Sequence, residues 1–447
     1  MVRDDYPRVL FLTPCAFNRV TGGGVLFSNL FRGWPLDSLA TVTNDSVPVE
    51  SDVCRRVYVL SSQELGWMRP FSGLRRWVQA SAGGGAPGRA GPLAPGRPPP
   101  LWFRIVQRAV GDAGIPDRGR LSPQLARWIE DFQPEVLYTI LGSPGIIGLA
   151  DAIRRRFDLP VAVHLMDEGV TDPKRTGLFG PYLRRLYRRT LTALLASSAT
   201  RLAICDAMAA EYQERYGGAF QAVPNLVDCD EWTPHLRTDL RPASPARVVY
   251  AGSILAFAQE QSLLDTADAV RDLAAAGQEI VLDVYTASAR LRPDTARRLS
   301  SAPVRLHEAP ESDNEFRRLL CSADVLLLPV NFDAGSIHFI RLSLPAKVPP
   351  YLASGVPILV YGPAGIAQVE YARQAGWGLV VDQHSPAALA AGLRRVLSDL
   401  PLRDALSRAA RQTARQHHAA DTVRCRFRRA LAAAASQRGS PPDVDAC

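Results

Sequence analysis

The chain has 447 residues, of which 47% are hydrophobic and 21% are charged. This length exceeds one ordinary domain, so two domains with full-sized cores are expected. No apolar run approaches the roughly 20 residues of a membrane-spanning helix, and the acidic start does not resemble a secretory signal. The composition therefore excludes a membrane-spanning chain and predicts a cytoplasmic globular protein.

The net charge is +8, but Lys174 and Lys347 are the only lysines among the 52 basic residues. This arginine bias is typical of a GC-rich genome, so a bacterial source is expected. A basic surface attracts nucleic acid, anionic lipid or anionic small molecules. Because no nucleic-acid-binding motif accompanies the charge, nucleic acid is not an expected partner. The seven cysteines are scattered without a Cys-x-x-Cys pair, which favours neither a disulfide framework nor a zinc site.

In the first half of the chain, short apolar runs alternate with amphipathic stretches, the pattern of a parallel α/β sheet. A triple glycine separates the first strand from the first helix. The predicted strands are 9–13, 39–43, 57–60, 136–140, 161–165, 201–205 and 220–223, and the predicted helices include 25–34, 181–196 and 206–216.

Two segments interrupt the alternation. Residues 81–100 are almost wholly Gly, Ala, Pro and Arg, which predicts a disordered insertion in the first domain. Residues 233–246 contain three prolines in a short polar stretch, which predicts an interdomain linker. The first domain is therefore expected to cover residues 1–232.

The second half repeats the same alternation, so it predicts a second doubly wound domain over residues 246–400. One long helical stretch, 402–435, is expected to close the fold as C-terminal helices within 401–436. The predicted strands are 247–251, 280–285, 304–307, 325–329, 357–361 and 378–381, and the predicted helices are 261–276, 315–321, 347–353 and 387–397.

Gly22-Gly23-Gly24 follows the first strand and precedes a helix. Glycines at this position let backbone N–H groups approach a phosphate or sugar, and a helix N-terminus favours negative charge. The triplet lacks the Gly-x-Gly-x-x-Gly spacing of a dinucleotide-binding loop. A phosphate-binding loop and a flexible strand-to-helix turn both fit the sequence.

A polar cluster ends the strand 161–165, where His164 is followed by Asp167 and Glu168. Parallel α/β sheets bind ligands beyond the carboxyl ends of their strands. His164 and Asp167 are therefore candidate catalytic residues, although a lone histidine at a strand end is also often structural.

Several ordered motifs resemble glycosyltransferase family 4, and the similarity covers nearly the whole chain apart from the insertion and the tail. Asn225-Leu226-Val227-Asp228 resembles the family's N-x-V-D element, and Tyr250-Ala251-Gly252-Ser253 resembles its glycine-ended strand. Residues 322–329 resemble the family's "ADVLLLPS" strand. Ser343 and Lys347 occupy the serine and lysine of its S-x-P-x-K element, which leads into a Tyr-Leu-Ala-Ser-Gly sequence.

This resemblance implies the GT-B fold, an α/β architecture in which two Rossmann-like domains face a central cleft. It also implies an acceptor on the first domain, a nucleotide diphosphate sugar on the second, and transfer with retention and without metal or another cofactor. The acceptor is expected to be a glycan, a lipid-linked molecule or a small molecule. The candidate catalytic residues remain His164 and Asp167, and the candidate donor-binding residues are Gly23, Gly24, Gly252, Ser253, Arg341, Ser343 and Lys347.

The sequence departs from the family at its Glu-x7-Glu pair, because Leu342 and Pro350 occupy those positions. The loop 253–260 also lacks the basic residues that many members carry. Two alternatives therefore stay open, a catalytically weak GT-B nucleotide-binding partner protein and a GT-B nucleotide-sugar epimerase.

Two other motifs receive a different interpretation. Asp228-Cys229-Asp230 matches an Asp-x-Asp metal motif, but it follows the N-x-V-D element at a domain edge, so no metal site is expected. The arginines in 184–189 could contact an anionic membrane peripherally, although a solvated helix face explains them as well.

Overall fold

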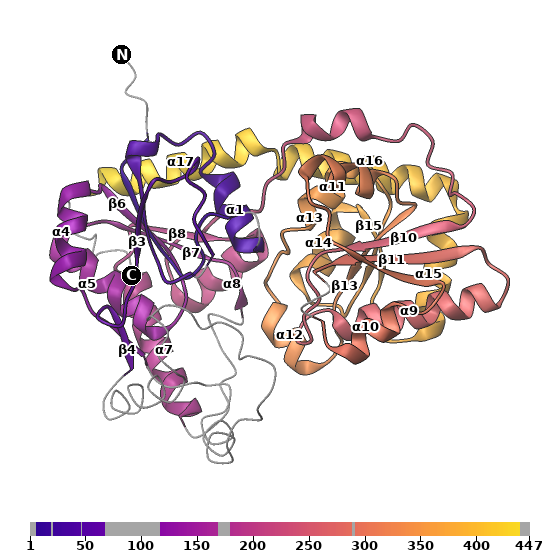
Figure 1. Cartoon of the computed structure of the whole chain (residues 1–447), viewed down its shortest axis with the longest axis horizontal. Helices are drawn as coiled ribbons and strands as arrows, with labels where there is room; N and C mark the ends of the chain where they lie inside the picture. Colours follow the sequence, from indigo (N-terminus) through magenta and orange to yellow (C-terminus); the bar gives the residue numbers. More distant parts are fainter. Residues whose placement is uncertain are drawn as a thin grey trace. The chain divides into compact units, whose positions relative to one another are not determined.

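The computed structural model describes residues 6–18, 21–45, 47–67, 117–168, 179–287 and 291–438. The predicted insertion 81–100 lies outside these residues. The chain forms two compact units, Met1–Val223 with Arg424–Cys447, and Pro224–Val423 (Figure 1). No helix in the described part of the chain is long and apolar enough to cross a membrane.

A seven-stranded parallel sheet forms the first unit, in the order β3-β2-β1-β6-β7-β8-β9. Every residue of β1, β2, β6 and β7 is buried, as expected for strands covered on both faces. The strands are β1 (Val9–Thr13), β2 (Leu39–Thr43), β3 (Arg56–Val59), β6 (Val136–Ile140), β7 (Val161–Leu165), β8 (Thr200–Ala203) and β9 (Gln221–Ala222), beside an antiparallel pair, β4 (Leu65–Trp67) and β5 (Asp117–Gly119).

The helices of the first unit begin at recognisable caps. Ser122 and Ser143 each accept a backbone N–H from the third residue along, and each is followed by proline at the first helical position. On the last helix, Phe427 packs edge-on against Phe31 and Tyr138 in the core. The helices are α1 (Gly22–Leu30), η1 (Leu36–Ser38), α4 (Pro123–Phe132), α5 (Pro144–Phe157), α7 (Gly180–Ala196), α8 (Asp206–Tyr216) and α17 (Ala420–Ser436).

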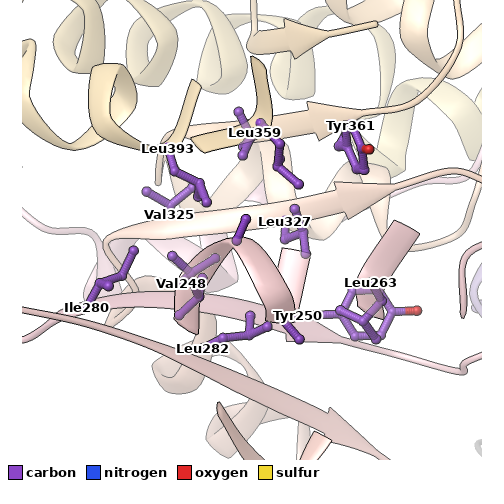
Figure 2. Close-up of a cluster of buried hydrophobic side chains, with 14 of the residues drawn as sticks. Val248, Tyr250, Leu263, Ile280, Leu282, Val325, Leu327, Leu359, Tyr361 and Leu393 are labelled. Carbon is purple, nitrogen blue, oxygen red and sulfur yellow. The ribbon is translucent and has the colours of Figure 1, made fainter. Parts of the chain in front are cut away.

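The second unit contains a six-stranded parallel sheet in the order β12-β11-β10-β13-β14-β15. Figure 2 shows side chains of neighbouring strands, among them Val248, Leu282, Leu327 and Leu359, meeting Leu393 of the helix α15 (Pro386–Ser398) in one buried layer. The strands are β10 (Ala246–Ala251), β11 (Ile280–Thr286), β12 (Val304–Glu308), β13 (Val325–Pro329), β14 (Ile358–Tyr361) and β15 (Gly378–Val381).

The boundary between the units falls after Val223, nine residues before the expected position at 232. The reason is the short helix η3 (Cys229–His235), whose buried Trp232 packs edge-on against Phe316 of the second unit. The other helices of this unit are α9 (Glu260–Ala275), α10 (Pro293–Leu299), α11 (Asp313–Cys321), α12 (Ala334–Ile340), α13 (Val348–Ser354), α14 (Ala367–Ala375), α15 (Pro386–Ser398) and α16 (Leu400–His417).

The predicted C-terminal helical stretch 402–435 is two helices, because it breaks between α16 and α17. The backbone carbonyl of His418 accepts a hydrogen bond from Val227 at 2.8 Å, and Ala420 donates to the carbonyl of Val227 at 3.0 Å. The ring Nδ1 of His418 lies 2.7 Å from the carbonyl oxygen of Asn225. These contacts use backbone groups that a continuous helix would need, and α17 continues into the first unit.

Candidate functional site

Each sheet has a point where consecutive strands are added in opposite directions. In the second unit, β10 is followed by β11 on one side, whereas β13, its other neighbour, is followed by β14 on the opposite side. In the first unit, β1 and β6 have the same relationship. Doubly wound sheets bind ligands beyond the carboxyl ends of such strand pairs. A ligand site is therefore expected at the loops after β1, β6, β10 and β13.

Lys347 lies beside the carboxyl end of β10. Its Nζ donates a hydrogen bond to the hydroxyl of Tyr250 at 2.7 Å and lies 3.9 Å from the centre of the same ring. Gly252 has a φ of +141°, and a Cβ there would come within 2.9 Å of the ammonium. Glycine is thus required at 252 both by its backbone conformation and by the close approach of Lys347.

The charge of Lys347 has no carboxylate within ion-pair distance among the residues that the structure describes. Desolvation lowers the pKa of Lys347 to about 7. Tyr250 cannot neutralise it, because burial raises the pKa of that phenol and keeps it protonated. A half-buried ammonium that faces only a neutral ring is suited to bind an anion.

The loop after β10 is held in place by two amides. Gln259 donates from its side chain to the carbonyl of Ser253, which also accepts the Tyr250 hydroxyl proton. Asn331, buried after β13, donates from its backbone to Ala258 at 2.8 Å and from its side chain to Ala256 at 2.9 Å. These hydrogen bonds hold the loop in one conformation, and Ser253 is exposed on it.

Arg341 and Ser343 lie with Lys347 on the segment between α12 and α13. The side chain of Asn225 donates to the carbonyl of Leu344 at 2.8 Å and so fixes this segment. The hydroxyl of Ser343 is buried without a hydrogen-bond partner among the described residues. At the positions of the family's glutamate pair, Leu342 is buried and Pro350 lies in the first turn of α13, so neither offers a carboxylate.

Gly252 was expected to be a donor-binding residue, but its backbone N–H is already in use. Its N–H donates to the carbonyl of Tyr285 at 2.9 Å within the sheet, so it is not available to a phosphate. The structure brings Gly252, Ser253 and Lys347 together. Backbone donors for a phosphate would have to come from the loop that begins at Ser253, because the N–H of Gly252 is already bonded.

In the first unit, Gly23 and Gly24 lie in the first turn of α1, the helix that follows β1 in the chain. The N–H of Gly24 donates to the hydroxyl of Thr21, which caps the helix, at 3.1 Å. A Cβ at Gly24 would lie 2.3 Å from the side chain of Asn18, and one at Gly23 would lie 3.1 Å from the sulfur of Cys15. Packing against Asn18 therefore explains why residue 24 is glycine. Its backbone N–H is already bonded to Thr21, so it does not fit the expected role of binding the sugar donor.

His164 is fully buried on β7, and its Nδ1 lies 2.8 Å from the hydroxyl of Tyr138. Desolvation lowers its pKa to about 3, so the ring is neutral. This setting does not fit the expected catalytic role of His164, since a fully buried ring cannot touch a ligand without rearrangement. Asp167, three residues later, is partly exposed and keeps the expected place after the strand.

Within the described parts of both units, no group of three or more His, Cys, Asp or Glu side chains is arranged to hold a metal ion. Asp228 is the N-cap residue of η3 but makes no side-chain capping hydrogen bond, and Asp230 lies in the first turn of that helix. The arginines at 185, 188 and 189 are exposed on α7, whereas Arg184 is half-buried.

Comparison with known protein families finds a match for most of the first unit. Residues 50–225 match the model of the glycosyl transferase 4-like domain. The resemblance found in the motifs and the predicted enzyme class, a glycosyltransferase, are thereby confirmed. No relative among the curated protein sequences matches the chain.

Solved structures similar to this chain match nearly its full length. The trehalose 6-phosphate synthase of Burkholderia multivorans is 14% identical with a TM-score of 0.59, and the match covers 96% of this chain and 99% of that one. HepE of Anabaena, solved with UDP, is 11% identical with a TM-score of 0.58 and coverages of 95% and 99%. WaaG, a glycosyltransferase involved in lipopolysaccharide biosynthesis, is 14% identical with a TM-score of 0.55 and the same coverages. The GT-B fold is confirmed.

Two residues that shape the site were not predicted from the sequence. Tyr250 orients Lys347, and Asn331 holds the loop after β10. A signal for Tyr250 was present, since it precedes the strand-ending glycine by two residues and shares its face of the sheet. Nothing local marks Asn331, because its role depends on the pairing of β10 with β13.

Proposed function

We propose that this protein transfers a sugar from a nucleoside diphosphate donor, and that Lys347 binds the diphosphate at the carboxyl end of β10. One observation carries the proposal: the Lys347 ammonium, which has no carboxylate partner in the described part of the chain, lies where the second sheet reverses its strand order. A diphosphate would supply the counter-charge that the protein does not. HepE of Anabaena has been solved with UDP and with UDP-glucose, which makes these the first ligands to test.

The chemistry follows from where negative charge develops. As the bond between the anomeric carbon and the diphosphate oxygen breaks, the leaving diphosphate gains charge, and a positioned ammonium stabilises it. The acceptor hydroxyl forms the new bond on the same face of the sugar and passes its proton to the departing diphosphate. We propose that this gives retention of configuration and needs no metal ion. Ser253, Arg341 and Ser343 are proposed to contact the donor beside Lys347.

His164 is proposed to act indirectly, as a positioning residue. Its contact with Tyr138 lies on β6 and β7, next to the strand pair whose loops would hold the acceptor. Asp167 is the proposed residue for direct contact with the acceptor, because it is partly exposed beyond the end of β7.

A catalytically weak nucleotide-binding protein is the second candidate. The buried Leu342 and the helical Pro350 motivate it, because glutamates are absent from both positions of the family's pair. Such a protein would bind UDP through Lys347 but would neither transfer nor hydrolyse a sugar.

The test combines turnover with analysis of the product. The full chain is incubated with UDP-glucose and other nucleotide sugars, and UDP release is measured with and without candidate glycan and lipid-linked acceptors. Lys347→Ala should lower the release rate at least about tenfold, the effect of losing one charged hydrogen bond. Arg395→Ala, which removes an equal charge from the exposed face of α15, should not change it. Equal rates in the two variants would refute the assignment of Lys347, and no release from any donor would favour the binding protein.

The first unit, on which the acceptor is proposed to bind, also carries a basic helix face that suits peripheral contact with a membrane. We propose that the exposed arginines 185, 188 and 189 of α7, beside the exposed Tyr182, can contact anionic lipid. Vesicle co-sedimentation of an Arg185→Gln and Arg189→Gln variant tests this point, and unchanged binding would contradict it.

A further inference from the structure

The helix α16 lies in the second unit (Figure 1). Its sequence carries Arg408, Arg411 and Arg415 at helical spacing. A groove of about 400 Å³ is lined by Arg408, Arg411, Gln412, Arg415 and Gln416. These positions follow the helical repeat and therefore share one face. The opposite face of α16 is buried in the unit, so the arginine face is not needed for the core.

The three arginines of this groove lack a charge partner among the described residues. In the described part of the chain, none of them lies within ion-pair distance of a carboxylate. Other arginines of the same unit do, as in the pairs Arg237–Asp324 at 2.8 Å and Arg247–Asp283 at 3.0 Å. Asp404 lies one turn before Arg408 on α16, but it forms no ion pair with it in the described structure. Positive charge in the groove is thus left for an external anion.

One of the three side chains is held in place by packing. The chain turns at Gly355, which ends α13 with a φ of +66°. A Cβ at Gly355 would lie 3.0 Å from Cδ and 3.2 Å from Cγ of Arg411. The alkyl part of Arg411 therefore rests on the glycine, which restricts the directions that its guanidinium can take.

The groove is distinct from the proposed donor site. Lys347 precedes α13 and Gly355 follows it, so the two are separated by a helix of seven residues, about 10 Å long. Helices that follow strands in such a sheet begin at its carboxyl edge, where Lys347 lies. Arg411 contacts the other end of the same helix.

We propose that the groove on α16 binds a small phosphorylated ligand at a second site, separate from the sugar donor. Guanidinium groups bind phosphate with paired hydrogen bonds, and three of them suit a group with two or more negative charges. The amides of Gln412 and Gln416 can bond the hydroxyl groups of a sugar or nucleoside. A volume of about 400 Å³ falls within the range of small-molecule sites.

The test separates this site from the donor site. Inorganic pyrophosphate is titrated calorimetrically into the full chain carrying Lys347→Ala, which removes the donor cation. Arg408→Gln, Arg411→Gln and Arg415→Gln are then added together, and binding should weaken at least about tenfold. The matched control adds Arg305→Gln, Arg394→Gln and Arg395→Gln, three exposed arginines that line no part of the groove, and binding should be retained.

A second variant keeps Arg411, whose packing on Gly355 supports the fold, and changes only Arg408 and Arg415 to glutamine. This double variant should also weaken pyrophosphate binding, and it provides the test if the triple variant fails to fold. The proposal is overturned if the groove and control variants weaken binding equally, or if Lys347→Ala alone abolishes it. Binding to phosphatidylglycerol vesicles without binding to pyrophosphate would likewise overturn it, in favour of a lipid surface. If the UDP-release assay shows that Lys347 does not bind the sugar donor, the pyrophosphate titration still tests the groove independently.

Discussion

Lys347→Met should stabilise the second unit while removing its donor binding. The substitution keeps a long apolar stem beside Tyr250 but deletes the charge. Burial lowers the pKa of Lys347 from its usual value of 10.5 to about 7, so the folded unit disfavours the ammonium. Lys347 is thus expected to lower the stability of the unit while it provides donor binding, a trade-off that is common at functional sites.

The magnitude follows from the linkage between protonation and folding. The folded pKa of Lys347 lies below the unfolded one, so the unfolded chain binds more protons between about pH 7 and 10.5, and stability rises with pH in that window. Each pH unit is worth about 1.4 kcal/mol at full effect. Because the side chain is partly exposed, we expect Lys347→Met to raise the free energy of unfolding by about 2 kcal/mol at pH 6, and the gain to shrink toward pH 10.

The assay is urea unfolding of wild type and Lys347→Met at pH 6, 8 and 9.5, with UDP binding measured on the same samples. Lys347→Arg is the matched control, because arginine stays charged across this range, so the stability of this variant relative to wild type should fall as the pH rises. A variant less stable than wild type at pH 6, or a difference independent of pH, would refute the account of Lys347 as an unpaired ammonium.

Three further outcomes are expected. Arg403→Met should lower the free energy of unfolding by about 3 kcal/mol, because the buried guanidinium donates to three backbone carbonyls; a loss below about 1 kcal/mol in urea unfolding would contradict this. Gly24→Ala should lower the melting temperature, because its Cβ would overlap Asn18, whereas Gly22→Ala meets open space and should not. Sugar transfer should persist in excess EDTA; loss of activity that Mn²⁺ restores would reopen residues 228–230 as metal ligands.

The strands were predictable because a parallel sheet buries both faces of its strands. Runs such as 9–13, 136–140 and 325–329 are apolar throughout, and the structure places β1, β6 and β13 on these residues. Helix ends were also readable where a serine cap and a proline follow each other, as before α15. Periodicity and capping are local signals, so a single sequence carries them.

Long-range pairing was not predictable in the same way. The sequence marks His164 as a polar residue at a strand end, but its contact with Tyr138 on the next strand makes it a neutral core residue. Likewise, the bond of Gly252 to Tyr285 removes a donor that its glycine suggested. The break at His418 depends on Asn225, which is 193 residues away in the chain.

The most direct test of the central claim is a crystal structure of the full chain with UDP. We expect a diphosphate oxygen about 3 Å from Nζ of Lys347, beside Ser253 at the carboxyl end of β10. Diphosphate density elsewhere, for example at Gly23 after β1, with Lys347 still bonded only to Tyr250, would contradict it.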